Sequence, residues 1–141
     1  MRNSEVGILK FCEEIDIRNL QTLSIAYVGD AYFHLFVRVR LLKYKYKVND
    51  LHALSAKIVS AIYQAKAYQE IESMLTEQEK EIFKRGRNAK SRSTHSATNT
   101  EYHNSTGFET LLGTLFLEGE YDRLDEIADK SFDFLMSEIN E

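Results

Sequence analysis

Two acidic side chains, Asp30 and Glu109, each stand alone as the only formal charge in a long apolar stretch. Asp30 lies in the segment IAYVGDAYFHLFV (25–37), and Glu109 lies in NSTGFETLLGTLFL (104–117). A carboxylate is costly to bury among apolar groups unless it is paired or bound to a cation. Mg²⁺ commonly takes one or two protein carboxylates and completes its shell with waters and phosphate oxygens. Both residues are therefore candidate catalytic residues and metal ligands, with Mg²⁺ as the ion and Mn²⁺ as its substitute.

A glycine lies close to each acid along the chain. Gly29 precedes Asp30, and Gly113 follows Glu109 by about one helical turn. Because glycine has no side chain, another helix or a ligand can approach closely at these positions. We expect the helices that carry the two acids to cross, with both carboxylates facing one metal ion.

Two other interpretations of these acids stay open at this point. Asp30 could pair with His34, four residues away, or with an arginine, and then bind no metal. Glu109 follows Thr106 by three residues, which is the spacing of a capping box at a helix N-terminus. In that case, Glu109 would serve only to start a helix.

The segment FKRGRNAKSRS (83–93) carries five positive charges in nine residues and leads into a stretch rich in Ser, Thr and Asn. Such cations can contact phosphates, and amides and hydroxyls can reach sugars or base edges. The alternative is a solvated helix end, whose cations favour the C-terminal dipole. A second basic stretch, RVRLLKYKYK (38–47), is the weaker candidate. The candidate nucleic-acid-binding residues are Lys84, Arg85, Arg87, Asn88, Lys90 and Arg92.

Helices are the elements expected to position these groups. Apolar periodicity is helical along most of the 141 residues, and a chain with no proline and only 6 glycines is a poor match to a turn-rich β fold. A capping box at Thr76–Glu79 opens one helix, and the polar residues 91–104 predict a long loop. We expect one all-α domain over residues 1–141 with about six or seven helices. The expected helices span 5–13, 19–42, a segment from Asn49 or Asp50 to about Ala65, a segment from Thr76 to between Gly86 and Lys90, 106–117 and 121–139.

Composition narrows the setting of the protein. A single cysteine, Cys12, cannot form an internal disulfide, so a reducing, cytoplasmic location is expected. No signal-peptide or membrane-spanning pattern is visible, so we expect no membrane partner. Residues 118–141 hold nine acids against two cations. The net charge of −4 therefore still permits a basic, polyanion-binding face elsewhere.

The motifs together resemble a known family. AYVGDAYFHLFVR and TGFETLLGTLFLEG are similar to the two signature helices of the ribonuclease III catalytic domain, and the intervening KRGRNAKS resembles the Mini-III branch, which lacks a double-stranded-RNA-binding domain. The resemblance implies that Asp30 and Glu109 match metal-binding acids of the family. Acids that longer relatives carry fall on Leu23, Ala26 and Thr106 here, which leaves the number of metal ions per site open.

The resemblance also implies an activity. It predicts a Mg²⁺-dependent endoribonuclease that works as a homodimer, cuts both strands of double-stranded RNA and leaves 5′-phosphate ends. Its expected substrate is the 23S ribosomal RNA precursor, gripped by the basic segment 84–92, with a large-subunit ribosomal protein as a further candidate partner. The competing hypothesis is a non-catalytic helical dimer that binds structured RNA or acts in ribosome assembly. The missing acids at Ala26 and Thr106 are its best support.

Overall fold

The computed structural model describes residues 7–89 and 98–140, and their regular structure is entirely helical. This confirms the expected all-α class and the expected number of helices. None of the described helices combines the length and apolar character needed to cross a membrane. The α-helices of the described residues are α1 (Ile8–Glu13), α2 (Thr22–Leu41), α3 (Val48–Ile58), α4 (Ala61–Ile71), α5 (Glu77–Arg87), α6 (Asn99–Leu117) and α7 (Tyr121–Ile139).

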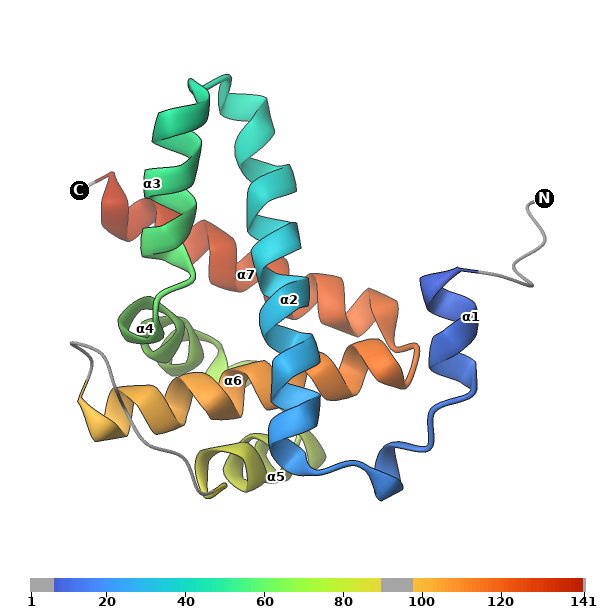
Figure 1. Cartoon of the computed structure of the whole chain (residues 1–141). Helices are drawn as coiled ribbons and strands as arrows, with labels where there is room; N and C mark the ends of the chain where they lie inside the picture. Colours follow the sequence, from blue (N-terminus) through green and yellow to red (C-terminus); the bar gives the residue numbers. More distant parts are fainter. Residues whose placement is uncertain (1–6, 90–97, 141) are drawn as a thin grey trace.

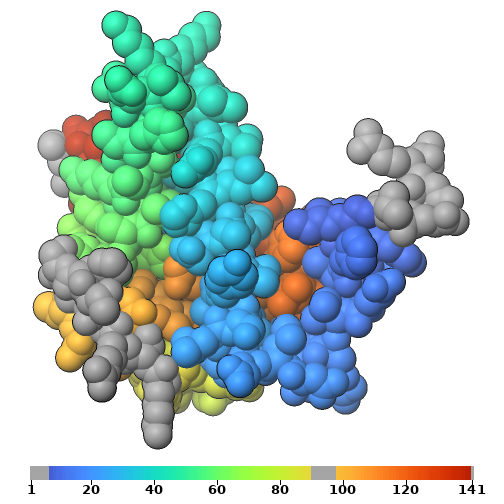
Figure 2. Space-filling model, viewed as in Figure 1, coloured from blue at the N-terminus to red at the C-terminus, as the bar shows by residue number. Residues whose placement is uncertain are grey.

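Helix α6 is the centre of the fold, and α2, α4, α5 and α7 all pack against it (Figure 1). Ten of its residues are buried. This burial explains why most residues of α6 are apolar or small. Phe108 of α6 meets Phe33 of α2 edge to face, with ring centroids 5.2 Å apart. Helices α2 and α3 form a hairpin that rises from this body, and α1 lies at its side (Figure 2).

Helix α6 begins earlier than its sequence pattern predicts. The predicted start at Thr106 is wrong, and so is the predicted loop over its last residues. The Thr98 hydroxyl accepts a hydrogen bond from the Glu101 amide, and the Glu101 carboxylate accepts one from the Thr98 amide. This is the same kind of capping box that the sequence predicts at Thr76 and Glu79, where the structure confirms it.

The expected helix from Asn49 or Asp50 to about Ala65 is two helices. Lys47, not Asn49 or Asp50, is the N-cap of α3. The chain turns at Ser60, whose hydroxyl accepts a hydrogen bond from the Tyr63 amide and starts α4. An apolar pattern alone could not show this break, because apolar positions continue at helical spacing across it. The turn places residues of both helices beside α6.

Candidate active site

The site is built where α2 crosses α6 at two glycines. A Cβ atom on Gly29 would lie 1.8 Å from the carbonyl oxygen of Glu109, and one on Gly113 would lie 2.1 Å from that of Ile25. Both neighbours are backbone atoms, so no rotamer change could relieve the overlap. The expectation that these glycines permit a close helix approach is confirmed. The crossing brings the backbone of Glu109 directly against the turn of α2 that carries Asp30.

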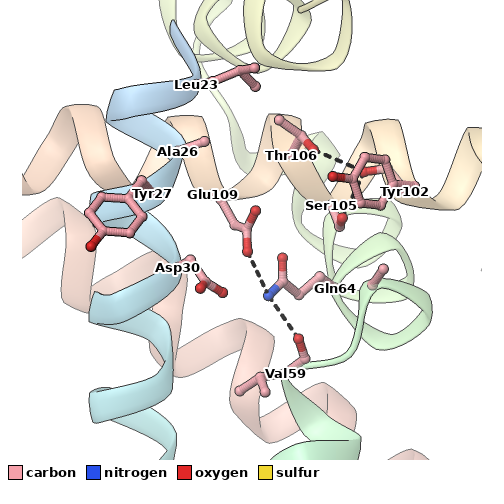
Figure 3. Close-up of a pocket in the computed structure, with 11 residues that line it drawn as sticks. Leu23, Ala26, Tyr27, Asp30, Val59, Gln64, Tyr102, Ser105, Thr106 and Glu109 are labelled. Atoms are coloured by element: carbon pink, nitrogen blue, oxygen red, sulfur yellow. Dashed lines mark hydrogen bonds between the residues drawn. The ribbon is translucent and has the colours of Figure 1, made fainter. Parts of the chain in front are cut away.

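Asp30 and Glu109 line one pocket of about 370 Å³ between α2, the α3–α4 turn and α6. Figure 3 shows the two carboxylates facing each other across this space, with Gln64 entering from α4. The three positions where longer relatives carry acids also line the pocket, and there they contribute no carboxylate. These positions are Leu23, Ala26 and Thr106.

Glu109 is a largely enclosed carboxylate with no cationic partner among the described residues. Its one side-chain hydrogen bond comes from the Gln64 amide, whose Nε2 lies 3.3 Å from Glu109 Oε2. Burial raises the pKa of Glu109 well above its ordinary value, and the neighbouring Asp30 carboxylate raises it further. The Gln64 hydrogen bond lowers the pKa of Glu109, but by less. A positive ion between the two carboxylates would favour their ionised forms and so oppose both causes of the raised pKa.

The structure also decides between the other interpretations of these acids. Glu109 lies in the middle of α6, far from the capping box at Thr98 and Glu101, so a capping role for Glu109 is wrong. No arginine pairs with Asp30 among the described residues. His34 does approach it, with Nε2 3.1 Å from Asp30 Oδ1. That contact engages one carboxylate oxygen and leaves the other directed at the pocket.

The donor set suits a hard, oxygen-preferring cation. The described residues contain no group of three or more His, Cys, Asp and Glu side chains that could hold a metal. Two carboxylates beside an open pocket match Mg²⁺, which keeps several waters and recruits substrate phosphate oxygens. The Ser105 and Thr106 hydroxyls donate to the Tyr102 carbonyl, so their oxygens remain available only as acceptors.

Sequence reasoning missed Gln64 as a member of this site. It is 1% exposed and touches Glu109 across a separation of 45 residues. No motif in the sequence around it marks it as a residue of the site. The only signal was its place on the apolar face of α4, next to Ala65 and Tyr68.

The basic segment begins at the C-terminal end of α5. Lys84, Arg85 and Arg87 lie in its last turn, and Asn88 is its C-cap. The glycine between them, Gly86, faces Thr110 so closely that a Cβ there would lie 2.3 Å from the threonine hydroxyl. This contact fixes the basic end of α5 against the helix that carries Glu109. The other two predicted residues, Lys90 and Arg92, lie outside the described residues.

The cations of this helix end differ in how they are engaged. Lys84 lies 3.6 Å from Glu81, and Arg87 donates to the Asn88 side chain at 3.3 Å. No carboxylate pairs with Arg85 or Arg87 among the described residues. Their charges are available to an anion, although a favourable interaction with the helix C-terminus explains their position equally well.

Comparison with known proteins identifies the class to which this fold and site belong. Residues 23–120 match the ribonuclease III domain model. A solved structure, protein FN1578 from Fusobacterium nucleatum, superposes with a TM-score of 0.74 at 32% sequence identity, covering 81% of this chain and 93% of that one. The chain therefore belongs to the ribonuclease III family, whose members are endoribonucleases that depend on a divalent metal ion and act on double-stranded RNA.

Curated relatives narrow the assignment within that family. The Mini-ribonuclease 3 of Symbiobacterium thermophilum is 45% identical over 118 residues, which cover 82% of this chain and 91% of the relative. That of Thermoanaerobacter sp. is 38% identical over 136 residues, covering 93% and 96%. This places the chain in the Mini-ribonuclease 3 branch, and confirms the resemblance and enzyme class predicted from the sequence.

Proposed function

We propose that Asp30 and Glu109 are the catalytic, metal-binding carboxylates of this endoribonuclease, with Mg²⁺ as the ion and Mn²⁺ as its substitute. The observation that carries the proposal is that a largely enclosed carboxylate, Glu109, and a half-exposed one, Asp30, line one pocket with no lysine or arginine paired to either among the described residues, at a helix crossing that tolerates only glycine. When bound there, a divalent ion supplies an activated water and stabilises charge on the phosphate and on the leaving oxygen.

The side chains of the pocket have distinct roles in this proposal. Glu109 is held in place by Gln64, so one of its oxygens is fixed and the other is directed to the ion. Asp30 is more exposed, with 46% of its side chain accessible, and it lies at the mouth of the pocket, where a phosphate of the duplex can enter. Hydrolysis at this position leaves 5′-phosphate ends.

We also propose that the end of α5 and the segment after it grip the duplex. Duplex RNA is recognised mainly through its shape, its phosphates and its 2′-hydroxyls. Support comes from the unpaired Arg85 and Arg87 and from the contact between Gly86 and α6, which ties this end to the helix of Glu109. The proposed RNA-binding residues are Lys84, Arg85, Arg87, Asn88, Lys90 and Arg92.

The proposed working form is a homodimer in which each protomer cuts one strand. Large apolar side chains are exposed along α2, and they support self-association because a free surface rarely leaves so many uncovered. The substrate we propose is the 23S ribosomal RNA precursor, with a large-subunit ribosomal protein as a candidate assisting partner. The exposed α2 residues are Leu23, Tyr27, Leu35 and Val39.

Cleavage of long double-stranded RNA, with and without Mg²⁺, tests the assignment. We expect Asp30→Asn and Glu109→Gln each to lower the cleavage rate at least ~10³-fold, since the ion contributes several kcal/mol to catalysis. Circular dichroism and a duplex-binding assay serve as controls, and both should be unchanged. Full activity of Asp30→Asn in Mg²⁺ would refute the metal assignment. A wild-type protein that binds duplex RNA without cutting it would instead favour the non-catalytic helical dimer.

A further inference from the structure

Gln64 carries a buried oxygen with no partner. Its Oε1 has no hydrogen-bond donor within reach, and it is the only buried side-chain nitrogen or oxygen in this condition among the described residues. The residue is 1% exposed, so bulk solvent does not satisfy the oxygen either. Leaving a buried acceptor without a donor is unfavourable, so this oxygen is placed to accept a hydrogen bond that the described residues do not supply.

The orientation of the Gln64 amide is fixed by its other end. Nε2 donates to the Val59 carbonyl at 3.0 Å and to Glu109 Oε2 at 3.3 Å, which uses both of its hydrogens. Rotating the amide by 180° would place Oε1 against the Val59 carbonyl oxygen, which can only accept. The unpaired atom is therefore the carbonyl oxygen, and it needs a donor.

No side chain in the part of the chain that the structure describes donates to this oxygen. The Ser105 and Thr106 hydroxyls already donate to the Tyr102 carbonyl, at 2.7 Å and 3.1 Å. Ala26 has no polar side chain, and Asp30 and Glu109 are acceptors when ionised. Figure 3 shows the Gln64 side chain reaching from α4 into the pocket, towards Glu109. A ligand that binds in the pocket can supply the missing donor.

We infer that Gln64 is a positioning residue for the divalent ion of this site, an inference that rests on the proposed function. Its amide group holds one oxygen of Glu109 and leaves the other for the ion, while its carbonyl oxygen accepts a hydrogen bond from a water in the hydration shell of the ion. Mg²⁺ held by two carboxylates keeps several waters, and each water supplies O–H donors. Gln64 thus supplies a polar group to a pocket in which Ala26 and Thr106 supply no carboxylate.

Mn²⁺ binding in the absence of RNA tests this role directly. Gln64→Met keeps the length of the side chain and removes both the donor and the acceptor. We expect its Mn²⁺ dissociation constant, measured by titration calorimetry, to rise about tenfold or more, because partners that orient a metal ligand typically contribute 10–100-fold to affinity. The matched control is Gln69→Met, an exposed glutamine on the same helix, which should bind Mn²⁺ like the wild type.

A second readout separates positioning from a merely structural effect. Gln64→Met should need more Mg²⁺ for half-maximal cleavage, while its KM for duplex RNA at saturating Mg²⁺ stays within about twofold of the wild type. Gln64→Glu loses the donor to Glu109, but it keeps an acceptor oxygen and adds a carboxylate to the pocket, so it should keep the wild-type Mn²⁺ affinity or tighten it. It carries the test if Gln64→Met fails to fold, and weaker Mn²⁺ binding by a folded Gln64→Glu would then overturn the inference.

The outcomes distinguish this inference from the proposed function. If the wild-type protein binds no Mn²⁺ and cuts no duplex, the metal site itself is wrong. If the wild type does both and Gln64→Met binds Mn²⁺ within about twofold of it, only the role of Gln64 is wrong. Gln64→Met could instead bind Mn²⁺ normally and lose cleavage of an all-RNA duplex but not of a duplex that lacks 2′-hydroxyls at the cleavage site. The donor to Gln64 would then belong to the substrate and not to the ion.

Discussion

Glu79 and Glu109 are both enclosed glutamates, and their partners are opposite in kind. Glu79 is 7% exposed and meets the guanidinium of Arg123, which donates to each of its two oxygens at 2.8 Å. The backbone amide of Thr76 donates to it as well. Glu109 has only the neutral Gln64 amide and faces a second acid, Asp30.

The pKa of each residue follows from these partners. Arg123 holds the pKa of Glu79 below its ordinary value, with the Thr76 amide as a smaller contributor. Burial and the neighbouring Asp30 raise the pKa of Glu109. The fold therefore supplies a cation where a carboxylate serves structure, and leaves the cation out where a carboxylate serves function. In the proposed function, a divalent ion completes the second arrangement.

The largest expected effect on stability comes from breaking the structural pair. Arg123→Met leaves Glu79 buried without its cation, and we expect the free energy of unfolding to fall by about 3–5 kcal/mol. Urea unfolding followed by circular dichroism measures the loss. Arg18→Met is the matched control, because Arg18 makes a similar two-point contact with Asp16 at the surface and should matter far less. Equal losses in the two variants would contradict the contrast between the buried and exposed pairs.

The pH dependence of stability should have opposite signs at the two glutamates. In metal-free protein, the raised pKa of Glu109 means that the unfolded state loses its proton first, so this residue lowers stability as pH rises above about 4.5. The lowered pKa of Glu79 contributes stability above that pH, which is lost on acidification. Unfolding of Glu109→Gln in a chelator from pH 5 to 8 tests the first expectation, and unfolding of Glu79→Gln from pH 3 to 5 tests the second.

From pH 5 to 8, we expect the free energy of unfolding of Glu109→Gln to rise relative to that of the wild type. The expected gain is on the order of 1 kcal/mol for each pH unit above the ordinary pKa of Glu109. Glu79→Gln should instead be less stable than the wild type at neutral pH and approach it in acid. Adding Mg²⁺ should stabilise the wild type and leave Glu109→Gln nearly unchanged. The same sign of pH dependence at both positions would show that the two glutamates do not differ in this way.

The smallest effect concerns the cations, where the same contrast holds. Arg123 contacts two acids, Glu79 and Glu126, whereas Arg85 and Arg87 pair with none among the described residues. Replacing Arg87 and Lys90 with Ala should raise KM for duplex RNA. It should also reduce the slope of log affinity against log salt by about one for each phosphate that the variant no longer neutralises. Lys130→Ala, on the acidic helix α7, is the control. A salt slope equal to that of the wild type would exclude these residues from the RNA-binding surface.

The sequence by itself determined the local elements and the two exceptional acids. Capping boxes are contacts over three residues, so Thr76–Glu79 could be predicted, and Thr98–Glu101 carried the same signal although it was missed. The charge isolation of Asp30 and Glu109 is visible in the sequence, because it depends only on the residues that flank each acid along the chain.

Tertiary structure decided which partners these residues meet. Gln64 reaches Glu109 across 45 residues, and Arg123 reaches Glu79 across 44, and no short-range pattern encodes such pairs. The turn at Ser60 starts α4, which carries Gln64, whereas the contact between Arg123 and Glu79 joins α7 to α5. An isolated charge in an apolar stretch can be recognised in the sequence. Whether a side chain or a ligand neutralises that charge depends on which helices come into contact.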